Sequence, residues 1–557
     1  MSDVPVRRPS PPIWAIWANP LVRRYAQSRL RPAAFGLRLL IVFLLTAFVF
    51  TATRAASVRS GMDGIDLARV PLIPLLVLQW FILYAFATGQ VAGGMTQEAD
   101  EDVLDYQRLA PMAPMAKVLG YLFGLPIREW LLFMVPLPFT VWSLVTGEVP
   151  WQIGLQLYAV FVAGAIMHHL TGLVAGTVIR NRRFAFLGAI ALVFMLYTLV
   201  PQIARFGLVF FKYITIMPVF EECYFHLIPR DAGAVAETVQ RLLPSAKFFG
   251  LDLPQFAFTL MSQGVLILVM LTMLWRRWRR SDSHLLGKLG AVSLFAWIQL
   301  AFLGSALPLI DTGELFPSRE LKRRFGRFMM DLPAAWSPTA SEAMAMIAAY
   351  GTVTVAILWW MTSIIAASRD VQIKGWRRAR KLAQPRLAIL SDAASSIPAV
   401  LIMAAIGCGG WLLFIDGVLS SRWFPDYQTP ANTLLVIAPV LFLSGLILSA
   451  MLEGRGARAT LLAAILCCIV PVMIGTVLGI WTEFLAAPAT WLIGICPAAW
   501  PTFAAGMIIP NNELSLRVTR AMPNAYIFYQ GLAGFIALRL LADLVRRRRA
   551  IAQEETV

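Results

Sequence analysis

The stretch "TQEADEDVLDYQRLAPMAPMAKVLGYL", residues 96–122, decides the fold because it is a polar segment between two apolar runs. The runs at 70–92 and 118–147 each reach the roughly 20 apolar residues that a helix needs to cross about 30 Å of hydrocarbon. We therefore interpret the stretch as a loop between two membrane spans. It contains five carboxylates followed by two prolines: Glu98, Asp100, Glu101, Asp102, Asp105, Pro111 and Pro114.

The composition extends this interpretation to the whole chain. Of the 557 residues, 59% are hydrophobic and only 14% are charged, with a mean hydropathy of +0.69. A soluble globular chain carries about 25% charged residues. No alternating ten-residue pattern indicates an outer-membrane barrel, so backbone groups in lipid must be paired within helices. The sequence predicts an all-α polytopic membrane protein.

Twelve apolar runs are candidate spans, and they form two similar sets of six. The first set is 34–53, 70–92, 118–147, 152–179, 184–204 and 256–275; the second is 289–310, 344–367, 397–418, 431–452, 459–481 and 522–545. In each set a long mixed insert precedes the sixth run and an arginine cluster follows it, which favours a parallel internal repeat. The expected parts are a cytoplasmic tail with an interfacial helix (1–33), two six-span halves (34–280 and 281–549) and a cytoplasmic tail (550–557).

Individual segments refine this plan. Pro126, Pro136 and Pro138 predict that the third run is kinked or begins outside the hydrocarbon. Residues 13–33 combine two tryptophans with four arginines, which favours a helix lying in the membrane interface over a disordered basic tail.

The positions of Lys and Arg predict the orientation. With twelve alternating spans and an inner N-terminus, most of the 48 Lys and Arg residues fall on the inner side, as cytoplasmic loops require. The basic loop 369–386 supports this topology, whereas the basic loop 311–343 falls on the outer side and argues against it. We expect a multi-pass protein of the cell (inner) membrane with both termini in the cytoplasm.

The net charge of +17 and the five cysteines indicate no further site. The basic residues cluster in loops, so they do not imply nucleic acid as a partner. The cysteines have no CxxC spacing and four of them lie in apolar runs, so we interpret them as packing thiols. No cofactor or metal is expected.

The acidic stretch predicts a short helix. Thr96 can cap it, and Glu98, Glu101, Asp102 and Asp105 have the spacing of one acidic stripe. Pro111 should end this helix near Ala110. The residues alone leave two readings open, a solvated loop helix without a partner and a contact for a cytoplasmic protein.

The same stretch resembles the first cytoplasmic loop of ABC-2 type permeases, the membrane subunits of many bacterial ABC exporters. Glu98 and Asp100 match the acidic positions of that loop, Leu104 the leucine of its Thr-Leu pair, Pro111 and Pro114 its two prolines, and Leu119-Gly120 its Leu-Gly pair. Asp102 and Val103 depart from the usual Gly-Thr, and Tyr121 departs from the usual Lys. Residues 19–32 also resemble the elbow helix that opens such permeases.

This resemblance implies a function and a site. The chain would be the permease subunit of an exporter for an unidentified substrate, driven by a separate cytoplasmic ABC ATPase. The loop would be the coupling helix that docks into this ATPase, with Glu98, Asp100, Leu104, Pro111, Pro114 and Gly120 as its residues. Further partners would be the lipid bilayer and a second copy or second permease.

Other classes of protein remain as alternatives. The corresponding loop of the second half, from residue 369, is basic and has one proline, which favours a membrane scaffold or accessory subunit that does not transport. No P-loop motif occurs, so ATP hydrolysis would require another subunit. We expect no enzyme: Glu221 and Glu222 begin a pattern similar to that of intramembrane CAAX-type proteases, but His226 stands where that pattern has Arg.

Two ionisable pairs lie within predicted spans and are candidates for function. His168 and His169 are neighbours on a helix and point about 100° apart, so a polar packing contact is favoured over a metal or haem site. Arg128 and Glu129 are interpreted as an interfacial pair in preference to a substrate contact.

Overall fold

The computed structural model describes residues 15–204, 206–229, 246–280, 283–319, 337–383, 387–481, 485–509 and 515–554. Within these ranges twelve helices are long and apolar enough to cross a membrane. The only strands in the described residues are β1 (Ala246–Phe248) and β2 (Leu251–Leu253), which pair with each other. The prediction of an all-α polytopic membrane protein with about twelve spans is therefore confirmed.

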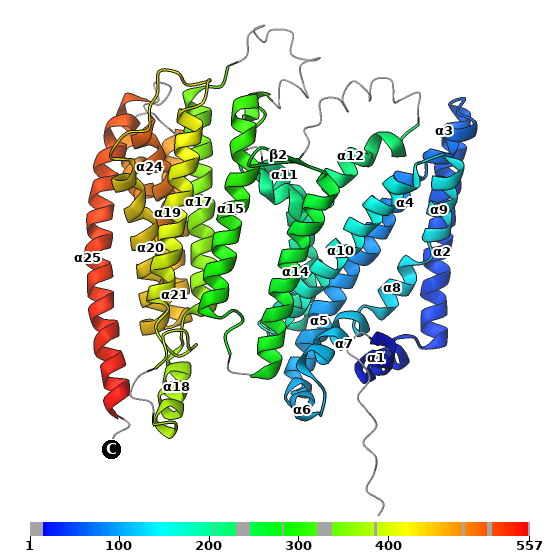
Figure 1. Ribbon diagram of the computed structural model, residues 1–557, viewed down its shortest axis with the longest axis horizontal. Helices are drawn as coiled ribbons and strands as arrows, with labels where there is room; N and C mark the ends of the chain where they lie inside the picture. The colour runs from blue at the N-terminus through cyan, green and yellow to red at the C-terminus, as the bar shows by residue number, and fades with distance from the viewer. Residues whose placement is uncertain are drawn as a thin grey trace, which may run out of the picture. The chain divides into compact units, whose positions relative to one another are not determined.

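The chain separates into two compact units (Figure 1). Unit 1 contains residues 1–201, 211–246 and 253–281, and unit 2 contains residues 202–210, 247–252 and 282–557. Unit 2 thus includes two short segments that precede its spans in the sequence, 202–210 and 247–252. The basic loop 311–343 lies largely outside the described residues.

The elements of the first half begin with a short interfacial segment and end with the sixth span. They are η1 (Ile16–Ala18), α1 (Pro20–Arg29), α2 (Pro32–Arg59), α3 (Gly64–Arg69), α4 (Leu72–Trp80), the π-helical η2 (Phe81–Phe86), α5 (Ala87–Asp100), α6 (Val103–Leu109), α7 (Pro114–Gly124), α8 (Ile127–Phe133), α9 (Leu137–Thr146), α10 (Trp151–Gly176), α11 (Arg182–Ala204), η3 (Val209–Ile214), α12 (Met217–Leu227) and α14 (Gln255–Arg279).

The elements of the second half begin with α15 and end with the long helix α25. They are α15 (Lys288–Thr312), α17 (Ala340–Ile365), α18 (Arg369–Lys381), α19 (Ile397–Leu419), α20 (Thr433–Arg455), α21 (Ala457–Ala464), the π-helical η4 (Ile465–Ile469), α22 (Val470–Trp481), α23 (Ala486–Gly494), η6 (Pro497–Ala499), α24 (Trp500–Ile508) and α25 (Leu516–Glu554). The short helices α23 and α24 meet at a bend of 110°, as in a broken span or a re-entrant loop.

The prolines divide the third apolar run as expected. The helix α7 ends at Gly124, and Pro126 precedes α8. A second interruption at Pro136 precedes α9. Because proline lacks an N–H donor and its ring clashes with the preceding turn, the span proper runs only from Ile127 to Thr146.

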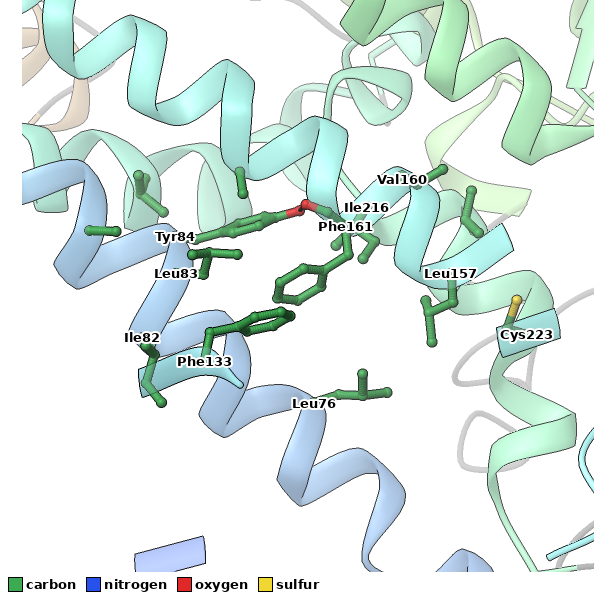
Figure 2. Close-up of a cluster of buried hydrophobic side chains, with 14 of the residues drawn as sticks. Leu76, Ile82, Leu83, Tyr84, Phe133, Leu157, Val160, Phe161, Ile216 and Cys223 are labelled. Carbon is green, nitrogen blue, oxygen red and sulfur yellow. Dashed lines mark hydrogen bonds between the residues drawn. The ribbon is translucent and has the colours of Figure 1, made fainter. Parts of the chain in front are cut away.

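A cluster of buried hydrophobic side chains, which includes Tyr84, Phe133 and Phe161, forms part of the core of unit 1 (Figure 2). Phe133 stacks on Phe161 with ring centroids 5.7 Å apart. The hydroxyl of Tyr84 donates to the carbonyl oxygen of Phe161 at 2.7 Å, so a polar group inside a lipid-embedded unit is paired. Tyr84 lies in the π-helical turn η2, and such turns interrupt the regular hydrogen bonding of a helix.

Unit 2 has a core of the same kind. The rings of Tyr350 and Phe414 stack at 4.6 Å, and the hydroxyl of Tyr350 donates to Gln299 at 2.7 Å. The indole N–H of Trp411 donates to the carbonyl of Ile347 at 2.9 Å. A side chain at Gly351 would overlap the Trp411 ring, so this glycine permits α17 and α19 to pack closely.

Candidate functional site

The loop between the second and third spans consists of a helix end, a tight turn and two further helices. The second span continues as α5 to Asp100, and Asp102 then adopts the left-handed conformation with φ of 55°. The helix α6 follows and stops at Leu109, because Ala110 before Pro111 is extended. The predicted end near Ala110 is therefore confirmed. In Figure 1, α6 lies with α1 and α7 at one end of unit 1.

Two local expectations for this loop are wrong. Thr96 does not cap a helix, because it lies inside α5, where its hydroxyl donates to the carbonyl of Ala92 at 3.0 Å. The acidic residues do not form one stripe, because the turn at Asp102 separates α5 from α6. The apolar span carries the helix past its predicted boundary, so Glu98 and Asp100 belong to the end of α5.

Glu98 is buried, with 7% of its surface exposed, and both of its oxygens are used within the chain. Its Oε1 accepts hydrogen bonds from Arg24 Nη2 and from the Tyr25 hydroxyl, each at 2.7 Å. Its Oε2 accepts a hydrogen bond from the Tyr121 hydroxyl at 3.1 Å. Hydrogen bonds to an ionised carboxylate are stronger than neutral ones. Glu98 therefore joins α5 to α1 and α7, and we call these four residues the Glu98 cluster.

The two tyrosines of the Glu98 cluster remain hydrogen-bond donors. Burial, followed by the charges of Tyr121 and Glu98, raises the pKa of Tyr25 far above its usual range. Burial and then Glu98 raise the pKa of Tyr121 in the same direction. Both hydroxyls are therefore protonated at any physiological pH, and each can donate to the carboxylate.

Gly120 and Gly124 allow α7 to lie directly against α1. A Cβ at Gly120 would stand 2.8 Å from the Cβ of Leu21, and one at Gly124 would stand 2.7 Å from the Tyr25 ring. The amide nitrogen of Asn19 donates to the carbonyl of Ala116 at 2.7 Å across the same contact. Gly120 thus serves helix packing inside unit 1.

The buried side and the C-terminal end of α6 contact the neighbouring helices. Leu104 is 8% exposed and packs in an apolar cluster with Tyr121 and Trp278. Lys117 donates to the carbonyls of Arg108 and Ala110 at 3.3 and 3.1 Å, which satisfies acceptors at the end of α6. Burial and then the charge of Arg108 lower the pKa of Lys117.

One face of α6 carries two exposed side chains with large apolar surfaces. Tyr106 is 74% exposed and Leu109 is 84% exposed, and their spacing of three places them on one face. Asp100, Glu101, Asp102 and Asp105 are exposed around them, as is Pro111. We call Tyr106 and Leu109 with these four carboxylates the α6 tip. Sequence reasoning missed the apolar pair, although its i, i+3 spacing between Asp102 and Pro111 was visible.

The six site residues predicted from the sequence therefore fall into two groups. Glu98, Leu104 and Gly120 are buried and contact other helices of unit 1. Asp100 and Pro111 are exposed, and Pro114 is half-buried at the first position of α7. The structure brings all of them to one end of unit 1, but only the second group is available at the surface.

A second polar group lies inside the third span. Arg128 Nε donates to Glu129 Oε1 at 2.9 Å, and Glu129 is 3% exposed. Both residues line a cavity of about 350 Å³ together with Arg38 and Gln90. Glu129 Oε2 has no hydrogen-bond partner among the described residues. The pair stands in the first turn of α8, at the beginning of the span Ile127–Thr146.

The two histidines of α10 are buried and point to different neighbours. His169 Nε2 lies 2.9 Å from the carbonyl oxygen of Leu83, and the His168 ring packs against Tyr84 at 4.9 Å. No group of three or more His, Cys, Asp or Glu residues in the described chain could hold a metal ion. Glu221, Glu222 and His226 lie together on the short helix α12.

The corresponding loop of the second half is a single basic helix. The helix α18 carries Arg369, Lys374, Arg377, Arg378, Arg380 and Lys381 and has one carboxylate, Asp370. Gly375 faces Ala393, so this helix folds back against the segment that precedes α19. The described part of unit 2 has no counterpart of the acidic, proline-bounded α6.

The fold and these loops define an all-α multi-pass membrane protein with a short, anchored helix outside the spans of its first unit. Comparisons with protein-family models, curated proteins and solved structures find no match for the chain.

Proposed function

We propose that the chain is the permease subunit of an ABC-2 type exporter and that a separate ATPase docks on the α6 tip. The observation that carries the proposal is that this loop has an exposed part, the α6 tip, and a buried part that contains Glu98, Leu104 and Gly120. Tyr106 and Leu109 offer an apolar contact, while Glu98 fastens the adjoining helix end to α1 and α7.

The α6 tip favours a particular kind of partner surface. Exposed aromatic and apolar side chains of this kind are typical anchors of protein interfaces when they fill a pocket. Asp105 forms an ion pair with Arg108, so Asp100, Glu101 and Asp102 are the carboxylates that favour a basic rim on the partner, which would steer association. The partner would therefore present an apolar groove bordered by Lys or Arg.

The buried contacts of the loop connect α6 to the membrane spans and would transmit a movement of α6 to them. A force on α6 acts on α5 through the turn at Asp102, and on α7 through Lys117. The ring of Tyr121 stacks on Trp278 at 5.3 Å, which connects α7 to the last turn of the sixth span. ATP would bias two states of the transporter by changing the ATPase that holds the tip. This route requires both termini and α6 to be cytoplasmic, as the positions of Lys and Arg predict.

The test is a pull-down of the detergent-solubilised full chain from its native host. We expect a P-loop ATPase to co-purify with the unaltered chain. The double variant Tyr106→Asp with Leu109→Asp should lower the recovered amount of this ATPase at least tenfold. Leu251→Asp is the matched control, because Leu251 is 62% exposed and belongs to the insert predicted on the outer side. Equal recovery of the ATPase with both variants, or no ATPase with any form, would contradict the proposal.

The basic α18 favours a second candidate function, a scaffold or accessory subunit that does not transport. A complete pseudo-symmetric pore would be expected to couple both halves to ATPase subunits, and the acidic motif is confined to the first half. The discriminating measurement is ATP turnover by the reconstituted complex. Transport is favoured if the permease stimulates ATP turnover and if Glu98→Ala abolishes this stimulation while the ATPase stays bound. The scaffold is favoured if the ATPase binds but its ATP turnover does not change.

A further inference from the structure

Unit 2 contains a basic pocket at the end of its spans that lies outside the proposed docking site. The cavity has a volume of about 580 Å³ and is formed by the ends of α17 and α20, the beginnings of α18 and α21, and the last part of α25. Arg369, Arg455 and Arg547 line it, and all three are exposed. Leu452, Leu544 and Ile551 supply apolar walls.

The pocket has an unbalanced positive charge. Glu453 is the one carboxylate in its lining, and its oxygens are already used: Ser396 donates from its backbone nitrogen at 2.6 Å and from its hydroxyl at 2.7 Å, and Arg548 donates at 2.7 Å. Among the described residues no carboxylate forms an ion pair with Arg369, Arg455 or Arg547. Arg547 donates to the carbonyl oxygen of Gly454, which also lines the pocket. The pocket therefore holds three guanidinium groups, none of which is paired with a carboxylate among the described residues.

Backbone donors add to this charge. Ser368 precedes α18 and Gly456 precedes α21, and neither residue caps its helix with a side chain. Both residues line the pocket, so the first turns of two helices, whose N–H groups have no partner within their own helix, lie beside the three arginines. Guanidinium groups and helix N-termini are matched to the oxygens of a phosphate group.

We propose that this pocket binds the phosphate of an anionic phospholipid headgroup. The spans α17, α20 and α25 end at it, so it lies at the depth where the membrane places its phosphates. Basic pockets between transmembrane helices bind such headgroups. Leu461 and Leu462 on α21 are 63% and 59% exposed, and they offer an apolar surface for the acyl chains beside the pocket. The proposal does not depend on the presence of an ATPase.

The first arm of the test compares lipids that remain bound to the purified full chain, measured by native mass spectrometry. The pocket variant is Arg369→Gln with Arg455→Gln and Arg547→Gln. The control is Arg378→Gln with Lys381→Gln and Arg546→Gln, which removes the same charge from exposed positions outside the pocket. Because the pocket variant loses three arginines that attract an anionic headgroup, we expect its retention of phosphatidylglycerol to fall more than tenfold. An equal loss in the control would overturn the proposal.

The second arm distinguishes a lipid from a free anion. Dioctanoyl phosphatidylglycerol should raise the thermal unfolding temperature of the unaltered chain, whereas dioctanoyl phosphatidylcholine and inorganic phosphate at the same concentration should not. Equal protection by inorganic phosphate would replace the lipid with a soluble phosphate and overturn the assignment. Ala457→Trp fills the pocket without changing its charge and should abolish the protection; full protection in this variant would also overturn it.

Discussion

The hydroxyl of Tyr121 donates a hydrogen bond to Glu98 Oε2 at 3.1 Å, 23 residues away along the chain. This bond closes the loop that contains α6, because Glu98 ends the second span and Tyr121 begins the approach to the third. Arg24 and Tyr25 bind the other oxygen of the same carboxylate. One buried carboxylate thus fixes the interfacial helix α1 and both ends of the loop.

Replacing Glu98 should destabilise unit 1. Glu98→Ala leaves the hydroxyls of Tyr25 and Tyr121 without their acceptor, and each buried unpaired donor costs about 1–3 kcal/mol. The loss of the ion pair with Arg24 contributes less to this destabilisation, because the Arg24 side chain is 45% exposed. We expect a clearly lower thermal unfolding temperature in detergent. Glu101→Ala is the control, since Glu101 is exposed, and it should change stability by less than about 0.5 kcal/mol; similar losses in both variants would argue against a structural role of Glu98.

Gly120 should be intolerant of any side chain. In Gly120→Ala the new Cβ would stand 2.8 Å from Leu21 Cβ and 2.9 Å from Asn19 Oδ1, so α1 must move away from α7. Overpacking of this kind costs about 1–3 kcal/mol. The matched variant Gly36→Ala has no atom within 4 Å of the new Cβ and should be neutral or stabilising in its helix. Thermal unfolding of the two variants checks the contrast, and equal effects would show that α1 is not held by this contact.

Arg128 and Glu129 should behave as a coupled pair. Removing one partner of a buried ion pair leaves an uncompensated charge and costs about 3–5 kcal/mol, whereas removing both costs less. We therefore expect Glu129→Ala to destabilise the chain more than Arg128→Ala with Glu129→Ala together. A double-mutant cycle of unfolding free energies measures this coupling. Strictly additive effects would indicate that Glu129 is balanced by another cation.

The orientation of the chain can be checked by cysteine labelling in intact cells. With α6 in the cytoplasm, Leu109→Cys and Leu382→Cys should react with an impermeant maleimide only after the cells are opened. Leu251→Cys should react in intact cells, because its insert is predicted outside. These three positions are 84%, 61% and 62% exposed. The five native cysteines set the background in the unaltered chain, and labelling of Leu109→Cys in intact cells would reverse the predicted topology.

Much of the fold could be predicted because lipid imposes a simple rule on sequence. Every candidate span overlaps a helix of the structure, since a run of about 20 apolar residues in hydrocarbon has only the helix to satisfy its backbone. The boundaries were less accurate: the second span was expected to end at residue 92, but its helix continues to Asp100. Polar residues can extend such a helix when a neighbour binds them, as Arg24 and the two tyrosines bind Glu98.

The candidate site stays a prediction, and the sequence indicated only the segment that contains it. Residues 98–114 contain the exposed tip, but the motif alone treated Glu98, Leu104 and Gly120 as equivalent to Asp100 and Pro111. Spacing along a helix does not reveal which side meets another helix. The helix α1 buries Glu98 and covers Gly120, and it lies more than 70 residues earlier in the chain. The exposed Tyr106 and Leu109 were missed for the opposite reason, because apolar residues are ordinarily expected to be buried.

The sequence by itself determined the class of this protein, its twelve apolar helices and the polar loop that ends at Pro111, because hydropathy and proline geometry act locally. Only the tertiary structure decided that Glu98 is an internal anchor, that Tyr106 and Leu109 form the accessible face of α6, and that Arg369, Arg455 and Arg547 meet around one cavity. These relationships depend on which helices pack together. Packing partners far apart in the chain leave no periodic signal in the residues themselves.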